Sequence, residues 1–160
     1  MTETAPEVTY ANYAGVVEIS SRKKEPVYDG DTLTLLRDVG QRTFIKTRFR
    51  LIGIDTPEKT GSEKEWGKIS RTHLLDLIGE TKYWWTFTDP WGATFKIPAL
   101  VSRTRMPDKY GGRWLGEIWS ERGKISLNLQ MIDDNFARAY DGSKKTLYPL
   151  DSLPIQPEVV

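Results

Sequence analysis

The chain has 160 residues, of which 38% are hydrophobic and 28% charged, and its formal net charge is +1. These values are ordinary for one soluble globular domain with its own core. There is no cysteine and one histidine, which excludes disulfides, thiolate metal sites and multi-histidine metal sites within the chain. A bound metal would need oxygen ligands, as calcium, magnesium and manganese prefer. No apolar run approaches the roughly 18 residues of a membrane span, and the polar N-terminus does not resemble a signal peptide, so we expect a cytoplasmic protein with no membrane contact.

The first third of the chain predicts three strands. Residues 1–12 are expected to form a flexible arm. Residues 13–19 are rich in β-branched side chains, and residues 32–36 alternate between polar and apolar. Residues 43–54 predict a longer strand, in which Gly53 marks a bulge or bend.

A helix is predicted next. Ser62 and Glu65 have the spacing of a capping box, an apolar stripe follows over residues 66–78, and Gly79 is placed to end the helix. His73 lies on this stripe, so we interpret it as a packed or half-exposed helix residue rather than a catalytic one.

Two further strands are predicted around a tight turn. Residues 83–88 favour a strand, "DPWG" has turn composition, and residues 93–97 can pair back. Trp91 lies on that turn and is expected to be exposed. Residues 98–107 are bounded by prolines and predict an irregular excursion.

The last regular elements are a strand at 113–119 and a short helix at 127–134. Ser126 is the expected cap of this helix, and Asn135 suits its left-handed end. About five short strands, with a helix inserted after the third, favour a small closed barrel. Residues 146–160 form a proline-containing tail without periodicity.

Four carboxylates lie at the ends of two predicted neighbouring strands. Each short motif alone is a weak signal, because Asp-Gly is a common turn and Thr-Pro-Glu can begin a helix. Together they predict a crowd of like charges that a hard divalent cation would relieve; its members are Asp29, Asp31, Asp55 and Glu58. Arg50 precedes two of them, and an arginine beside a metal suits a phosphodiester. Strict alternation would place Arg50 and Asp55 on opposite faces, so this hypothesis needs a bend at Gly53. A purely structural ion pair between Arg50 and Glu58 is the plainer alternative.

Basic residues are concentrated between Lys96 and Arg113, where there are five against one acid, and again in "SRKK" at 21–24. Such patches suit a polyanionic partner, but solvated loops would have the same composition.

Three motifs, "DGDT", "FRLIGIDTPE" and "DKYGGRWLG", together resemble the staphylococcal nuclease-type domain over residues 13–145. The later "LNLQMIDDNFARAY" is similar to that family's closing helix and strand. The resemblance implies a mainly β, α+β fold, namely a five-stranded OB-fold barrel with a helix after strand 3. An extra hairpin or loop insertion is expected before the last strand.

The resemblance also implies a calcium-dependent nuclease acting on DNA, RNA or both, with magnesium or manganese as alternative metals. Asp31, Asp55 and the carbonyl of Thr56 would be the metal ligands, with Asp29 behind them. Glu58 would be the general base. Arg50 and Arg113 would clamp the phosphate, and Tyr110 and Lys109 would contact the nucleotide.

The sequence departs from the family pattern in several places. Gly112 shifts Arg113 by one position, residues 89–107 and the loop at 22–26 are long, and the family's long final helix is missing. We hypothesise that Arg103 and Arg105 extend the substrate groove; a structural hairpin covering one end of the barrel is the alternative. The rival to a nuclease is a catalytically inactive OB-fold module that binds nucleic acid or protein. A monomer is expected.

Overall fold

The computed structural model describes residues 12–17, 27–39, 41, 43–79, 84–88, 91–92, 94–98, 100–120 and 125–158. The expected N-terminal arm up to residue 11 and the long loop at 22–26 lie outside the described residues.

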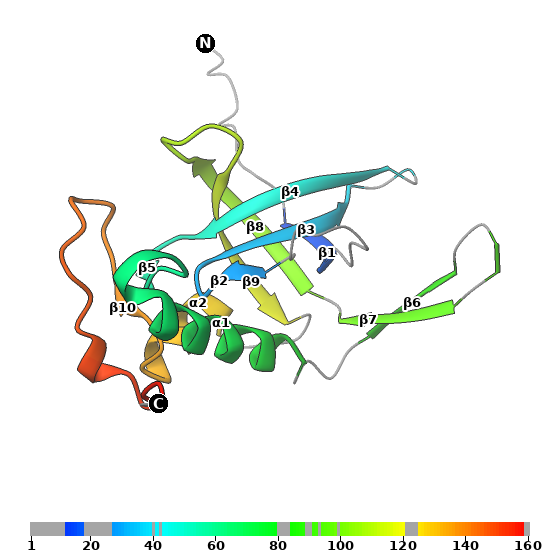
Figure 1. The fold of residues 1–160 in the computed structure, drawn as a ribbon. Coiled ribbons are helices and arrows are strands. Elements are labelled where there is room, and N and C mark those ends of the chain that lie inside the picture. Colours follow the sequence, from blue (N-terminus) through cyan, green and yellow to red (C-terminus); the bar gives the residue numbers. More distant parts are fainter. Residues whose placement is uncertain are drawn as a thin grey trace, which may run out of the picture.

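A six-stranded mixed sheet forms the centre of the molecule (Figure 1). Its neighbours are antiparallel except for one parallel pair, β4 with β9. In spatial order the strands are β1 (Asn12–Val17), β8 (Leu100–Pro107), β9 (Trp114–Ser120), β4 (Phe44–Leu51), β3 (Thr32–Asp38) and β2 (Val27–Asp29). The first strand, β1, also pairs with β3. The expected mixed α and β composition is therefore confirmed, whereas a closed barrel of five strands is not established.

The prediction of an irregular excursion at 98–107 is wrong, because Leu100–Pro107 is strand β8 of the central sheet. Ser102 and Thr104 of this strand are buried. Buried strand positions are usually apolar, so these polar residues hid the strand pattern in the sequence. Ser102 accepts a hydrogen bond from Arg37 Nε at 3.1 Å, which makes its burial tolerable.

A hairpin precedes β8, as the predicted pairing of residues 83–88 with residues 93–97 requires. It does not coincide with the insertion expected at 89–107, because residues 100–107 belong to the central sheet. Strands β6 (Trp84–Thr88) and β7 (Thr94–Pro98) pair only with each other among the described strands, and they extend away from the central sheet (Figure 1). Trp91, in the turn between them, is 88% exposed, as expected.

Two α-helices pack against the sheet, α1 (Lys64–Gly79) and α2 (Leu127–Asp133). The predicted capping box is wrong: a 3-10 turn, Gly61–Glu63, precedes α1, and Glu65 pairs with Lys68 instead. The capping of α2 is confirmed, because the Ser126 side chain accepts a hydrogen bond from Leu129 N, and Asn135 has a φ of 64°.

The core lies between the sheet and the two helices. Its fully buried members come from the sheet, α1 and α2, and include Leu33, Leu35, Phe49, Leu51, Ile54, Leu74, Leu100, Ile118 and Met131. Tyr148 and Leu153 also join this core. The segment after residue 140 contains one 3-10 turn, Leu150–Ser152, and no long helix among its described residues. The C-terminal segment is therefore part of the folded unit, which matters for the site described next.

No helix among the described residues has the length and apolar character needed to cross a membrane.

Candidate carboxylate–arginine site

A bend after β4 brings Arg50 and Asp55 to the same side of the chain. Gly53 has a φ of +82°, a left-handed conformation that glycine adopts without strain, and it separates β4 from β5 (Ile54–Asp55). Across this bend Arg50 Nη1 donates a hydrogen bond to the carbonyl of Ile54 at 3.0 Å. The bend that the sequence required is therefore present.

Arg50 lies between two buried carboxylates. Its Nη2 atom is 3.5 Å from Asp31 Oδ2 and 3.7 Å from Asp55 Oδ1. Asp31 reaches this position because Thr32 pairs with Arg50 in the β3–β4 register. Asp31 Oδ2 also accepts a hydrogen bond from Thr56 N at 3.2 Å. The structure thus places Arg50, Asp31, Asp55 and Thr56 together, as the sequence predicted.

Asp29 lies directly behind Asp31 and is also buried. Its Oδ1 accepts a hydrogen bond from Asp31 N at 3.3 Å. Burial, followed by the nearby charge of Asp31, raises the pKa of Asp29 to about 8. Between the two acids, a Cβ added to Gly30 would lie 2.9 Å from side-chain atoms of Ser70 and of Thr56, so this turn packs tightly against α1.

Glu58 begins the loop before α1 and keeps its side chain half exposed. Its backbone N–H donates to Glu63 Oε2 at 2.9 Å, and the other oxygen of Glu63 accepts a hydrogen bond from Tyr148 N at 3.4 Å. The Glu58 carbonyl packs directly on Gly67, where an added Cβ would be only 2.2 Å away. Glu63 and Gly67 therefore fix the backbone of Glu58, and Tyr148 holds Glu63 in place.

Two basic residues that sequence reasoning missed complete the cluster. Arg138, in β10 (Arg138–Ala139), pairs opposite Asp55 and binds Asp55 Oδ2 through Nε at 2.9 Å and Nη2 at 2.8 Å. Lys145 Nζ lies 3.0 Å from Asp55 Oδ1 and 2.6 Å from Glu58 Oε1. No spacing signal links these residues to the acids, because the contacts depend on how the C-terminal segment folds back.

A cavity of about 750 Å³ opens beside Arg50. It lies between the β8–β9 turn and the 140–145 loop, two segments on the same side of the molecule (Figure 1). Besides Arg50, its lining includes five basic or aromatic residues, namely Lys109, Tyr110, Tyr140, Lys144 and Lys145. The guanidinium carbon of Arg50 is 5.5 Å from the centre of the Tyr140 ring. The predicted nucleotide contacts Lys109 and Tyr110 therefore share one hollow with Arg50.

The other three predicted arginines do not line this cavity. Arg113 is turned toward Asp108, with Nη2 at 2.7 Å and Nε at 2.9 Å from Asp108 Oδ2. Arg105 pairs with Glu117, and the Arg103 guanidinium lies 5.7 Å from the centre of the Trp119 ring. The role of Arg113 as a phosphate clamp and the groove contacts of Arg103 and Arg105 stay predictions.

Few of the described carboxylates lie close enough together to bind one metal ion through their oxygens. No group of three or more histidine, cysteine, aspartate or glutamate side chains among the described residues is arranged to hold a metal. Arg50 Nη2 is nevertheless buried without a hydrogen bond in the described part of the chain, and its contacts with Asp31 and Asp55 are ion pairs of 3.5 Å and 3.7 Å. Two carboxylates, Asp31 and Asp55, and a backbone carbonyl fit a calcium-like ion that completes its shell with water or substrate. The observation that supports this fit is the donor set itself, two buried carboxylates held beside one guanidinium.

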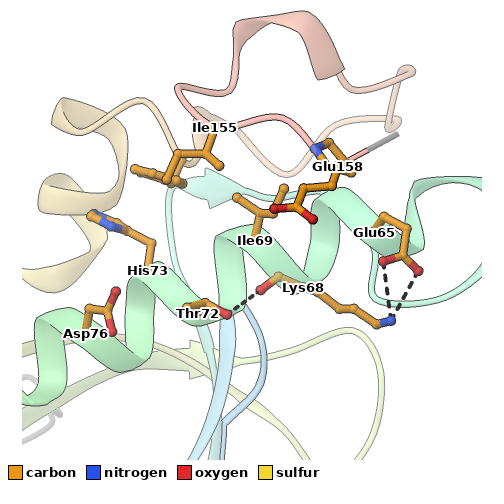
Figure 2. A pocket seen from close by; sticks show the side chains of 10 residues that line it. Glu65, Lys68, Ile69, Thr72, His73, Asp76, Ile155 and Glu158 are labelled. Atoms are coloured by element: carbon orange, nitrogen blue, oxygen red, sulfur yellow. Dashed lines mark hydrogen bonds and ion pairs between the residues drawn. The ribbon is translucent and has the colours of Figure 1, made fainter. Parts of the chain in front are cut away.

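A second hollow, of about 440 Å³, lies between α1 and the C-terminal segment (Figure 2). Ile69 and Ile155 face it from opposite sides. His73 also lines it, with Nε2 2.7 Å from Asp134 Oδ2 and its ring stacked on Phe136 at 3.8 Å. This packing agrees with the interpretation of His73 as a packed helix residue, and Arg50 does not line this hollow.

The fold and the site define an α+β domain with buried acids and an arginine beside an open cavity. Residues 48–151 match the family model described as staphylococcal nuclease homologue, and the chain belongs to this family. A comparison with curated proteins found no match. The matched range includes Arg50, Asp55 and Glu58 but begins after Asp29 and Asp31. The family indicates a nuclease-like or nucleic-acid-binding domain. The structure shows that Asp31, which lies outside the matched range, contacts the same arginine as Asp55.

Proposed function

We propose that the protein is a calcium-dependent nuclease that hydrolyses phosphodiester bonds of DNA, RNA or both. One observation carries the proposal. Arg50 Nη2 is buried and makes no hydrogen bond in the described part of the chain, it is held only by ion pairs of 3.5 Å and 3.7 Å to Asp31 and Asp55, and Arg50 lines a 750 Å³ cavity. A buried guanidinium donor without a hydrogen bond is costly, so its retention beside a cavity favours a ligand with phosphate oxygens, and the carboxylates beside it favour an accompanying cation. Family membership supports the same substrate class.

The acidic side of the site would hold the metal. Asp31, Asp55 and the carbonyl of Thr56 are the proposed ligands, and the bound ion would act as a Lewis acid toward a phosphate oxygen. Asp29 supports Asp31 through the hydrogen bond to its backbone. Magnesium and manganese, which also prefer oxygen ligands, are the alternatives to calcium.

Glu58 is the proposed general base. Its side chain is half exposed, so water can reach it, and its backbone is fixed by Glu63 and Gly67. Removing a proton from that water makes the nucleophile, a contribution typically worth about 10²–10⁴-fold. Arg50 would stabilise the negative charge that develops on the phosphate oxygens.

The far side of the cavity would bind the nucleotide. Tyr110 is well exposed there, and an exposed ring can stack on an unpaired base. Lys109 lies beside it and can contact a phosphate. Arg113 would serve as a second clamp only after exchanging Asp108 for a phosphate, because it is ion-paired in this structure.

Point variants test these roles. Glu58→Gln is expected to lower turnover about 10²–10⁴-fold while substrate binding stays nearly unchanged. Glu65→Gln is the matched control, because Glu65 is an exposed carboxylate on α1 that contacts Lys68. Arg50→Ala is expected to lower turnover and phosphate binding, and Arg50→Lys should not restore them, since lysine lacks the two-pronged donor geometry. Near-native turnover in Glu58→Gln would refute the assignment of the base.

A non-catalytic module that binds nucleic acid or protein is the second candidate. Two ion pairs favour it, because they occupy residues that catalysis would need. Lys145 pairs with Glu58, the proposed base, and Asp108 pairs with Arg113, the proposed second clamp. Tight binding of oligonucleotides without cleavage, in calcium, magnesium and manganese alike, would select this alternative. The pairing of β1 with both β8 and β3 supports an OB-type barrel under either function.

A further inference from the structure

The ammonium group of Lys145 lies between the two acids that the proposed function uses differently. It is 3.0 Å from Asp55 Oδ1, a proposed metal ligand, and 2.6 Å from Glu58 Oε1, the proposed base. The Asp55 side chain is only 3% exposed, whereas that of Lys145 is 42% exposed. The partly exposed Lys145 side chain thus contacts the buried Asp55 carboxylate.

The charge balance of the site explains why a cation is favourable there. Asp31, Asp55 and Glu58 carry three negative charges, whereas Arg50 and Arg138 supply two positive charges, so one carboxylate charge is left for Lys145 to balance. Burial lowers the pKa of Lys145, but the hydrogen bonds and charges of Glu58 and Asp55 outweigh this and raise it above its ordinary value. Lys145 therefore stays positively charged at neutral pH.

Arg138 holds the segment that carries Lys145. While Arg138 Nε binds Asp55, its Nη2 donates to the Thr146 carbonyl at 2.7 Å and its Nη1 to the Leu147 carbonyl at 3.1 Å. The two residues that follow Lys145 are thereby tied to the carboxylate that Lys145 contacts. Lys144 is adjacent and exposed, and it makes no hydrogen bond or ion pair with the described residues.

We propose that Lys145 is a tethered counter-ion that competes with the divalent cation for Asp55 and Glu58, and that metal binding displaces it. This inference rests on the proposed function. Displacement would separate Lys145 from both acids at once, because one ammonium group bridges them. Glu58 would then be released to accept a proton only when the metal is in place, so loading of the metal and readiness of the base are linked.

Calcium titration by calorimetry tests the competition. Lys145→Met is expected to bind calcium about tenfold more tightly than wild type, because one partly buried ion pair no longer has to be broken. Lys144→Met is the matched control, since it removes the same charge from the neighbouring position. It should change calcium affinity much less. Lys145→Gln is the second variant and should resemble Lys145→Met.

A labelling experiment tests displacement directly in the wild-type protein. A short pulse of an amine-acetylating reagent, followed by mass spectrometry, reports how accessible each ammonium group is. Without metal, Lys145 should react more slowly than Lys144. Saturating calcium should accelerate the labelling of Lys145 and leave that of Lys144 unchanged.

The outcomes separate this inference from the proposed function. Equal calcium affinity in Lys145→Met and Lys144→Met, or calcium binding without faster labelling of Lys145, would overturn the displacement model and leave a metal-dependent nuclease standing. If neither wild type nor any variant binds calcium, magnesium or manganese in the presence of a nucleotide, both the metal-dependent function and the counter-ion role are overturned.

Discussion

Gly67→Ala offers a sharp test of how α1 positions the proposed base. Gly67 lies inside a 16-residue helix, where glycine is less favourable than alanine by roughly 0.8–1 kcal/mol. The structure explains its presence, because an added Cβ would lie 2.2 Å from the Glu58 carbonyl oxygen and 2.7 Å from Lys59 N. Both neighbours are backbone atoms that cannot turn away, so the helix and the Glu58 loop must separate by about 1 Å.

Two effects of this separation can be estimated. Overpacking of this kind costs about 1–3 kcal/mol of unfolding free energy despite the better helix propensity of alanine. A shift of about 1 Å at a catalytic group can lower turnover about 10²-fold. Urea unfolding and oligonucleotide cleavage measure the two effects.

Gly79→Ala is the control for that test, because nothing lies within 4 Å of its added Cβ at the other end of the same helix. We expect this variant to match or slightly exceed wild type in stability. If Gly67→Ala were as stable and as active as Gly79→Ala, the argument that close contact with Gly67 positions Glu58 would be refuted.

Three further variants test other parts of the structure. Arg138→Met should lower the unfolding free energy by about 3 kcal/mol, because the buried Asp55 Oδ2 loses both of its contacts with Arg138; a loss below the roughly 1 kcal/mol of a surface pair would contradict this. Asn128→Ala should cost about 2–3 kcal/mol in urea unfolding, since its amide bonds three backbone groups around β9 and the β4–β5 bend, and a neutral result would count against that clamp. An Arg103→Ala, Arg105→Ala double variant should make the slope of log affinity against log salt shallower by about 0.7–0.9 per lost phosphate contact. An unchanged slope with a lower melting temperature would instead favour a structural role, such as the pairing with Glu117.

The sequence predicted the central residues of the site because they are local to recognisable motifs. Arg50 and Asp55 are five positions apart, and a glycine between them indicated the bend that the structure contains. Asp31 could be added because its strand was expected to neighbour that of Arg50. The family resemblance then supplied roles that periodicity and spacing alone could not.

Other features depend on contacts that are distant in the chain. Lys145 and Glu58 are 87 positions apart, and only the folding back of the C-terminal segment reveals their contact. Gly67 has no local signal beyond being a glycine in a helix, since its reason is the backbone of another segment. Strand β8 was missed because its buried Ser102 and Thr104 are polar and prolines flank the segment, which reads as a loop in sequence alone.

Cleavage of labelled single- and double-stranded DNA and RNA, measured with calcium and with excess chelator, tests the central claim most directly. Wild type and Glu58→Gln should be purified in parallel, so that a contaminating nuclease would appear in both. The account predicts that wild type cleaves at least one substrate in calcium, that chelator abolishes this cleavage, and that Glu58→Gln is slower by about 10²-fold or more. Full activity in excess chelator, or equal activity in the two proteins, would contradict a metal-dependent nuclease that uses Glu58.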